Sequence, residues 1–238
     1  MKKLAFFLFL ALAFAMPSMG QTLALNPIAD SFVSSANPNN NYGAAGSLEV
    51  SATGSAKGIF DSLMQFNLSG ATGWYIQSIS LQLVAANPVN GLFNSSTAGQ
   101  FSVVWMQNSG WTEGSGTPMA SSTNGGITYN TLPGYLGSSD ETVGTFSFSG
   151  ATSGTNTYSL QLTPGFLNAV TTGSDVSLEI VPADDSVSYL FNSNNFTNAS
   201  ARPLLTVTAV PEPAALAASV LLPALALAAS SRRGRRRG

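Results

Sequence analysis

Carboxylates are the main side chains of this sequence that could do chemistry. The 238 residues contain no histidine and no cysteine. This removes the usual general base of serine and cysteine hydrolases, the imidazole and thiolate ligands of zinc, and every disulfide. What remains is a pair of acids acting on a polysaccharide, or carboxylate oxygens that bind calcium. Either kind of site needs acids in loops that the fold brings together.

One group of acids suits a carboxylate-dependent polysaccharide hydrolase or lyase. Glu113, Asp140 and Glu141 occur in loop-like stretches and could converge. A glycoside hydrolase needs two carboxyl groups about 5 to 9.5 Å apart, but nothing in the spacing requires this. Solvated loop carboxylates are the simpler interpretation, and the scarcity of Lys and Arg leaves a lyase without a cation for its substrate. We therefore predict that the protein is not an enzyme and keep catalysis as the alternative.

Structural calcium is the cofactor that the acids favour, since a hard cation prefers carboxylate and carbonyl oxygens from loops. Asp30, Asp184 and Asp185 are the ligands that we single out. The sequence has no Asp-x-Asp-x-Asp-Gly run of the kind found in EF-hand loops. The calcium prediction therefore rests on residue type alone.

Aromatic residues among turn residues could contact a carbohydrate, because sugar rings stack their C–H faces on aromatic side chains. The candidates are Trp74, Trp111, Tyr129 and Tyr135. The alternative is that these side chains plug the ends of the fold, and we favour this packing role for Trp111.

The charges of the body exclude one class of partner. Between residues 21 and 210 only Lys57 and Arg202 oppose ten acids, a net charge of −8. Because such a surface repels phosphate backbones, nucleic acid is excluded as the expected partner.

Alternation of apolar and polar residues runs through the body and predicts strands. It is clearest in 78–83, where Ile and Leu alternate with Ser and Gln. The other predicted strands lie at 47–51, 60–66, 101–105, 158–162, 176–180, 189–191 and 204–210. One helical connector is predicted at 163–170, with Thr163 as its cap and Pro164 in its first turn. About ten strands without a compositional break favour one all-β domain, a jelly-roll-like sandwich of two antiparallel sheets.

The N-terminal end has the composition of a targeting segment. Lys2 and Lys3 precede an apolar run over 4–15, and the small residues Ser18 and Gly20 follow. This order is typical of a secretory signal peptide, which we assign to residues 1–20. A membrane anchor is disfavoured, because the run would cover roughly 18 Å of a hydrocarbon core about 30 Å thick.

The C-terminal end has three parts. Pro211-Glu212-Pro213 comes first, an uncharged and mostly apolar stretch over 214–231 follows, and an Arg-rich tail ends the chain. As a helix the apolar stretch reaches about 27 Å, just enough to span a membrane, and the arginines would keep the tail in the cytoplasm. A permanent tail anchor is one interpretation of this pattern.

Over residues 210–238 this ending resembles the PEP-CTERM sorting signal of bacterial exported proteins. The resemblance implies that a membrane exosortase recognises Pro211-Glu212-Pro213 and removes the transmembrane helix and the tail. The body would then be held only transiently at the inner membrane before it reaches the cell surface or an extracellular polysaccharide matrix.

Segments of the body, in order, resemble the DNRLRE domain, a secreted sandwich family that has also been classed among carbohydrate-binding modules. The segments that carry the resemblance are 29–33, 40–43, 48–50, 62–69, 76–81, 111–114, 127–133 and 202–207. The resemblance implies one sandwich domain over residues 21–209, with carbohydrate binding or adhesion as its role. The sequence departs from the family pattern at Gln65 and Asn67, which replace Arg and Asp, and at Tyr129, which replaces Trp. Any polar role of the family at Gln65 and Asn67 is therefore open.

Overall fold

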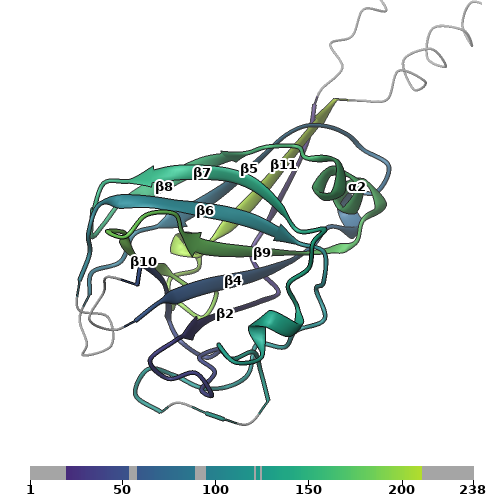
Figure 1. The fold of residues 1–238 in the computed structure, drawn as a ribbon. Helices are drawn as coiled ribbons and strands as arrows, with labels where there is room; N and C mark the ends of the chain where they lie inside the picture. Colours follow the sequence, from purple (N-terminus) through teal and green to yellow (C-terminus); the bar gives the residue numbers. More distant parts are fainter. Residues whose placement is uncertain (1–19, 54–57, 89–94, 121, 124, 211–238) are drawn as a thin grey trace, which may run out of the picture.

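The described part of the chain folds as a sandwich. The computed structural model describes residues 20–53, 58–88, 95–120, 122–123 and 125–210. The strands in these ranges form two antiparallel sheets that face each other (Figure 1). This confirms the predicted two-sheet antiparallel sandwich. Residues 1–19 of the predicted signal peptide, and the predicted sorting motif and transmembrane helix after Val210, lie outside the described residues.

The two sheets differ in size. The smaller sheet has four strands, in the order β1 (Gln21–Leu25), β11 (Leu204–Val210), β5 (Tyr75–Val84) and β8 (Thr155–Leu160). The larger sheet contains β10 (Ser188–Asn192), β3 (Ser47–Ser51), β4 (Phe60–Asn67), β9 (Asp175–Pro182), β6 (Gly99–Met106) and β7 (Glu141–Phe148), and β2 (Ala29–Ser34) also pairs with β4. Helix α2 (Pro164–Thr172) joins β8 to β9, and the 3₁₀ helices η1 (Ser69–Ala71), η2 (Leu132–Gly134) and η3 (Ala199–Ala201) lie in loops. Within the described ranges, no helix is both long and apolar enough to span a membrane.

The strands predicted from alternation are confirmed, with small changes in their bounds. Within β5, Ile79, Leu81 and Leu83 are fully buried, as the pattern requires. Strands β1, β2 and β7 are additional to those that the alternation predicts. Strand β7 lacks a regular alternation because its pairing with β6 shifts register between Val103 and Val104, and a bulge there places successive side chains out of phase.

Aromatic rings hold the two sheets together. Phe101 of β6, in the larger sheet, meets the ring of Tyr158 of β8, in the smaller sheet, edge to face at 5.1 Å between centroids. Tyr189 of β10 stacks on Phe148 of β7 at 3.8 Å. Because large rings bury much apolar area and add a favourable pair geometry, this cluster contributes strongly to stability.

Glu141 organises the start of α2, where Thr163 had been expected to cap. The Thr163 side chain makes no capping bond to the helix; its hydroxyl donates instead to Glu141 Oε2, at 2.5 Å. The backbone N–H groups of Gly165 and Phe166 donate to the two oxygens of the same carboxylate, each at 3.0 Å. These bonds, led by that from Thr163, lower the pKa of Glu141. Glu141 thus has a structural role in the fold.

We expect Phe101→Ala to destabilise the sandwich by about 3–5 kcal/mol, because it leaves a cavity between the sheets. The measurement is the free energy of unfolding in urea. The matched control is Ser102→Ala at the next position, on the opposite face of β6, which should change stability by less than about 0.5 kcal/mol. Equal losses in the two variants would show that the face assignment of β6 is wrong.

Candidate functional site

The segment 107–140 covers part of the outer face of the larger sheet. An outer cluster of buried apolar residues forms between this segment and β2, β4 and β6: Val33, Leu63, Met106, Trp111, Ile127 and Leu132. Figure 1 shows the segment and η2 beside β2 and β4, at the side of the sandwich away from β8. The larger sheet therefore buries apolar side chains on both of its faces.

Trp111 anchors this segment to the sheet. Its side chain is only 3 % exposed, and the indole Nε1–H donates to Ser177 Oγ on β9 at 3.0 Å. Gln65 of β4 adds two bonds from Nε2, to the carbonyl oxygens of Ser109 and Trp111, both at 3.0 Å. Trp111 thus has the packing role that the sequence favoured, and its ring is not available to a sugar. Gln65, which replaces the family's Arg, holds the backbone of the covering segment.

Two acids, Asp61 of β4 and Glu179 of β9, form what we call the carboxyl pair on the same outer face. Glu179 lies opposite Leu63, and Asp61 lies two residues before Leu63, so the two acids are diagonal neighbours on adjacent strands. Asp61 is 8 % exposed and Glu179 is 5 % exposed. No described residue forms a hydrogen bond with either carboxyl group.

Burial changes the protonation of the carboxyl pair. It raises the pKa of Asp61 to about 7. It raises the pKa of Glu179 to about 8, with further contributions from the charges of Asp61 and Asp140. Near neutral pH Glu179 therefore keeps most of its proton and Asp61 is partly protonated, so the pair can both donate and accept hydrogen bonds.

Short side chains surround the carboxyl pair on this face. Val104 of β6 lies opposite Glu179, and Ser102 lies opposite Val181. The Ser102 hydroxyl is also 2.8 Å from the Thr145 hydroxyl on β7. The side chains of Ser102, Val104, Thr145 and Val181 are partly or fully exposed. The face beyond the segment 107–140 therefore presents hydroxyl and methyl groups beside the two acids.

The predicted hydrolytic acids are not brought together, and each of the three has another role. Asp140 accepts the backbone N–H groups of Gln107 and Gly137, at 2.9 and 2.7 Å, and so closes the turn before β7. Glu141 binds the start of α2, and Glu113 lies beside Asp30. The described contacts of these three carboxylates lie in different loops, and the hydrolase or lyase alternative stays a prediction.

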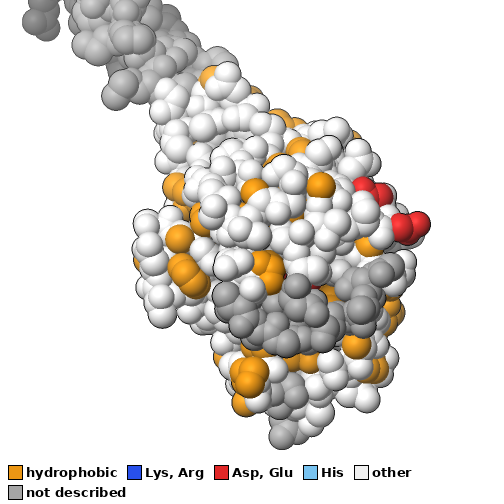
Figure 2. Space-filling view, turned by 90° about the vertical axis from the view of Figure 1, so that its left-hand side faces the viewer, with side chains coloured by type: hydrophobic (Ala, Val, Ile, Leu, Met, Phe, Trp, Pro, Cys, Tyr) orange, Lys and Arg blue, Asp and Glu red, His pale blue; other side chains and the backbone are white. Residues whose placement is uncertain are grey.

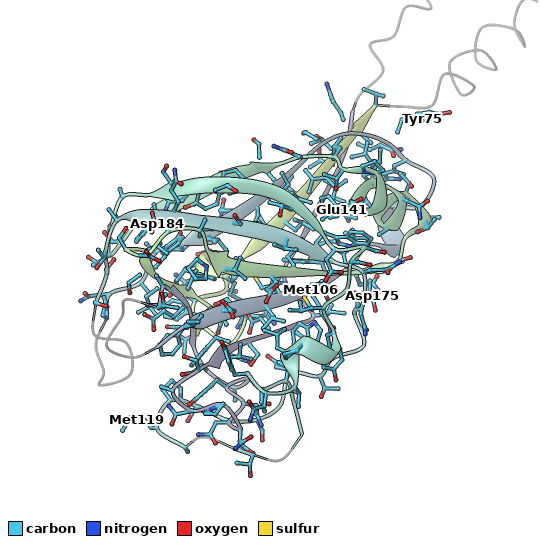
Figure 3. All side chains as sticks on the ribbon, in the orientation of Figure 1. Tyr75, Met106, Met119, Glu141, Asp175 and Asp184 are labelled. Atoms are coloured by element: carbon cyan, nitrogen blue, oxygen red, sulfur yellow. The ribbon has the colours of Figure 1, made fainter. Side chains whose placement is uncertain are left out.

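The predicted calcium ligands do not converge either. Asp184 accepts the backbone N–H groups of Gln100, Ser186 and Val187, and the bond from Ser186 leads in lowering its pKa. Figure 3 shows Asp184 at the edge of the sandwich beside β6. Among the described residues, no group of three or more Asp, Glu, His or Cys side chains could hold a metal ion. Asp30 lies instead beside Glu113, and calcium binding stays a prediction.

The remaining aromatic candidates lie in two places. Tyr129 and Tyr135 are half-buried and pack against the outer cluster, on the face that carries the carboxyl pair. Trp74 is half-buried against the main core. Its neighbour Tyr75 is 55 % exposed and lies near the point where the ends of the described chain leave the sandwich (Figure 3). Trp74 is therefore separate from the other two.

Sequence reasoning did not single out Asp61 and Glu179. One signal was present: each acid stands between two core-facing residues of a predicted strand, as in Leu178-Glu179-Ile180, and so must point to the other face. Their proximity could not be inferred, because it depends on β4 pairing with β9 across a long stretch of sequence.

The carboxyl pair should make stability depend on pH. Between pH of about 4 and about 8 the folded acids keep protons that the unfolded chain has released, so stability falls as the pH rises. Asp61→Asn and Glu179→Gln should each be more stable than the unchanged protein at pH 9, by roughly 1–3 kcal/mol, since one pKa unit equals about 1.4 kcal/mol.

Urea unfolding at several pH values measures this effect. Asp185→Asn, at an exposed acid, is the matched control and should keep the original slope. Part of the slope should persist in both test variants, because burial also raises the pKa of Asp30 to about 7. If both variants were less stable than the control at pH 9, the carboxyl pair would be stabilising and the assignment would fail.

Comparison with known families agrees with this architecture. The model of carbohydrate-binding module family 96 matches residues 21–209, which run from the start of β1 almost to the end of β11. A comparison with curated proteins gave no match. Because the matched range covers the whole sandwich and most of the sequence, the chain belongs to carbohydrate-binding module family 96.

Proposed function

We propose that this protein is an exported, non-catalytic carbohydrate-binding protein of the cell surface or extracellular matrix, and that it binds glycan on the outer face of its larger sheet. The observation that carries the proposal is the carboxyl pair: two acids buried on the outer face, without hydrogen-bond partners among the described residues, beside the partly exposed Val104 and Val181. Its support from comparison is the family match over the whole sandwich.

The chemistry of this face suits sugar hydroxyl groups. The carboxyl pair, partly protonated near neutral pH, can donate as well as accept hydrogen bonds, and a hydroxyl group does the same. The partly exposed Val104 and the exposed Thr145 would offer methyl and hydroxyl groups to a pyranose ring. Tyr129 and Tyr135 supply aromatic area beside the outer cluster for stacking on C–H faces.

The surface also suits an uncharged glycan. In the described part of the face drawn in Figure 2, most of the surface is polar and uncharged, with scattered apolar side chains and acids at one edge, and no Lys or Arg is seen. The net charge of −8 between residues 21 and 210 would repel a polysaccharide that carries carboxylates, so an uncharged glycan fits the protein better.

The path of the two ends supports attachment at one point. Gln21 of β1 pairs with Ala209 of β11, so the described chain begins and ends side by side (Figure 1). The predicted motif Pro211-Glu212-Pro213 follows directly after β11. A tail anchored there would hold the sandwich by one corner, with the segment 107–140 at the opposite side, facing away from the membrane.

Glycan binding is tested with residues 21–210, which include every strand of both sheets. The purified domain should bind at least one polysaccharide on a glycan array or in affinity electrophoresis. The double variant Asp61→Ala, Glu179→Ala should lose at least about tenfold in affinity, equivalent to about 1.4 kcal/mol. The exposed-acid control Asp185→Asn should bind as the unchanged protein does.

Stability separates a binding defect from unfolding, because removing these buried acids should stabilise the fold at neutral pH and above. Full binding by a folded double variant would disprove this location of the site. Release of reducing ends or unsaturated products from the same polysaccharide, lost in Glu179→Gln, would instead support the hydrolase or lyase alternative.

Sorting is tested in a cell that processes such signals. Replacing Pro211-Glu212-Pro213 by three alanines should leave the precursor in the membrane fraction at its larger size, because the exosortase would not recognise it. The unchanged chain should be recovered from the surface or the medium in a shorter form. Normal release of the triple-alanine variant would contradict exosortase processing and leave the tail as a plain anchor.

A further inference from the structure

A second group of polar side chains lies where four loop and strand segments meet. Asp30, at the start of β2, accepts the backbone N–H of Asn194 through Oδ2 at 2.5 Å. Its own N–H donates to Glu113 Oε1 at 3.4 Å. Asn195 Nδ2 donates to the same Glu113 oxygen at 3.1 Å and to the carbonyl oxygen of Gly43 at 2.7 Å. These bonds define what we call the Asp30–Glu113 cluster.

One carboxylate oxygen of this cluster has no hydrogen-bond partner in the part of the chain that the structure describes. Asp30 is 1 % exposed, and its Oδ1 is buried without a hydrogen bond from any described residue. The Glu113 carboxylate acts on it as a like charge. A buried and unpaired carboxylate beside a second carboxylate is strongly unfavourable unless something neutralises it.

Arg202 does not neutralise Asp30 by direct contact. Its charge acts on Asp30 from a distance, while its Nε donates to the carbonyl oxygen of Phe196 at 2.9 Å. Within the described residues, Asp30 forms no ion pair. The cluster therefore lacks a counter-charge at Oδ1, and its charge must be balanced by a proton or a bound cation.

The backbone segments that carry the cluster are in close contact. Gly43 touches the backbone of Glu113 so closely that an added Cβ would overlap the Glu113 carbonyl group. The absence of a side chain at Gly43 is what lets the 35–46 loop and the 107–140 segment meet here. The Gly43 carbonyl oxygen accepts a bond from the same Asn195 amide that contacts Glu113, so at least one backbone oxygen lies near the Glu113 carboxylate.

We propose that the Asp30–Glu113 cluster binds one calcium ion, with Asp30 Oδ1 and the Glu113 carboxylate as its charged ligands and neutral carbonyl or water oxygens completing the shell. Calcium accepts six to eight oxygens in adaptable geometry, which suits ligands from separate loops, whereas magnesium needs a near-ideal octahedron. Two carboxylates predict weak binding, with a Kd of about 10⁻⁴–10⁻³ M, the range of extracellular modules. The ion would also offset part of the −8 charge of the body.

Thermal unfolding of residues 21–210 at pH 7.5 is the test, in EDTA, in calcium and in magnesium at the same concentration. At calcium about ten times above Kd the midpoint should rise by roughly 3–6 °C relative to EDTA. Magnesium should give a smaller rise. Equilibrium dialysis with radioactive calcium should find one ion per chain.

Two isosteric variants assign the ligands. Asp30→Asn and Glu113→Gln should lose both the calcium-dependent rise and the bound ion, while Asp185→Asn keeps them. In EDTA, Asp30→Asn should unfold at or above the midpoint of the unchanged protein, because it removes a buried charge, so that its loss of response cannot reflect unfolding.

Three results would overturn the proposal. They are no bound calcium in the unchanged protein, an equal calcium response in Asp30→Asn, or loss of the response in Asp185→Asn. In the first case, a midpoint that rises only as the pH is lowered would show that a proton neutralises Asp30. None of these readouts involves a glycan, so the result stands apart from the proposed function.

Discussion

The packing of Trp111 against the outer face of the larger sheet is the interaction on which the rest of the structure depends. Strands β4 and β6 carry apolar residues toward the main core, but Leu63 of β4 and Met106 of β6 point outward and are buried by the covering segment. Trp111 anchors this segment, and its indole N–H finds Ser177 on β9 as a partner. Two consequences follow along the chain. Glu113, two residues later, lies beside Asp30, and the outer face beyond the segment carries Asp61 and Glu179.

Local patterns in the sequence predicted most of the fold. Alternation such as that of Ile79, Leu81 and Leu83 places strands because one side chain in two must be buried, and the start of α2 follows from Thr163 and Pro164. The pairing of strands was not predictable, because it is set by the whole core. For that reason the sequence grouped Asp30 with Asp184, whereas the structure groups it with Glu113. Trp111 was correctly favoured as a packing residue.

The acids show why residue type alone misplaces a site. Asp140, Glu141 and Asp184 look like solvent-exposed or catalytic carboxylates in the sequence, yet each accepts backbone N–H groups and fixes a turn or a helix start. The acids without such partners, Asp61 and Glu179, lie on regular strands. Their burial lowers the free energy of unfolding at neutral pH. A residue that lowers the stability of the fold in this way is a candidate for a functional role. Membership of a carbohydrate-binding family agrees with this view.

The central claim is that the outer face of the larger sheet, around Asp61 and Glu179, is the binding surface. Backbone amide chemical shifts of isotope-labelled residues 21–210, recorded during titration with an oligosaccharide of the bound glycan, test it most directly. The account predicts that the shifts concentrate on β4, β9 and β6 around Asp61, Glu179 and Val104. Shifts confined to the smaller sheet, or to the surroundings of Trp74 and Tyr75, would contradict it.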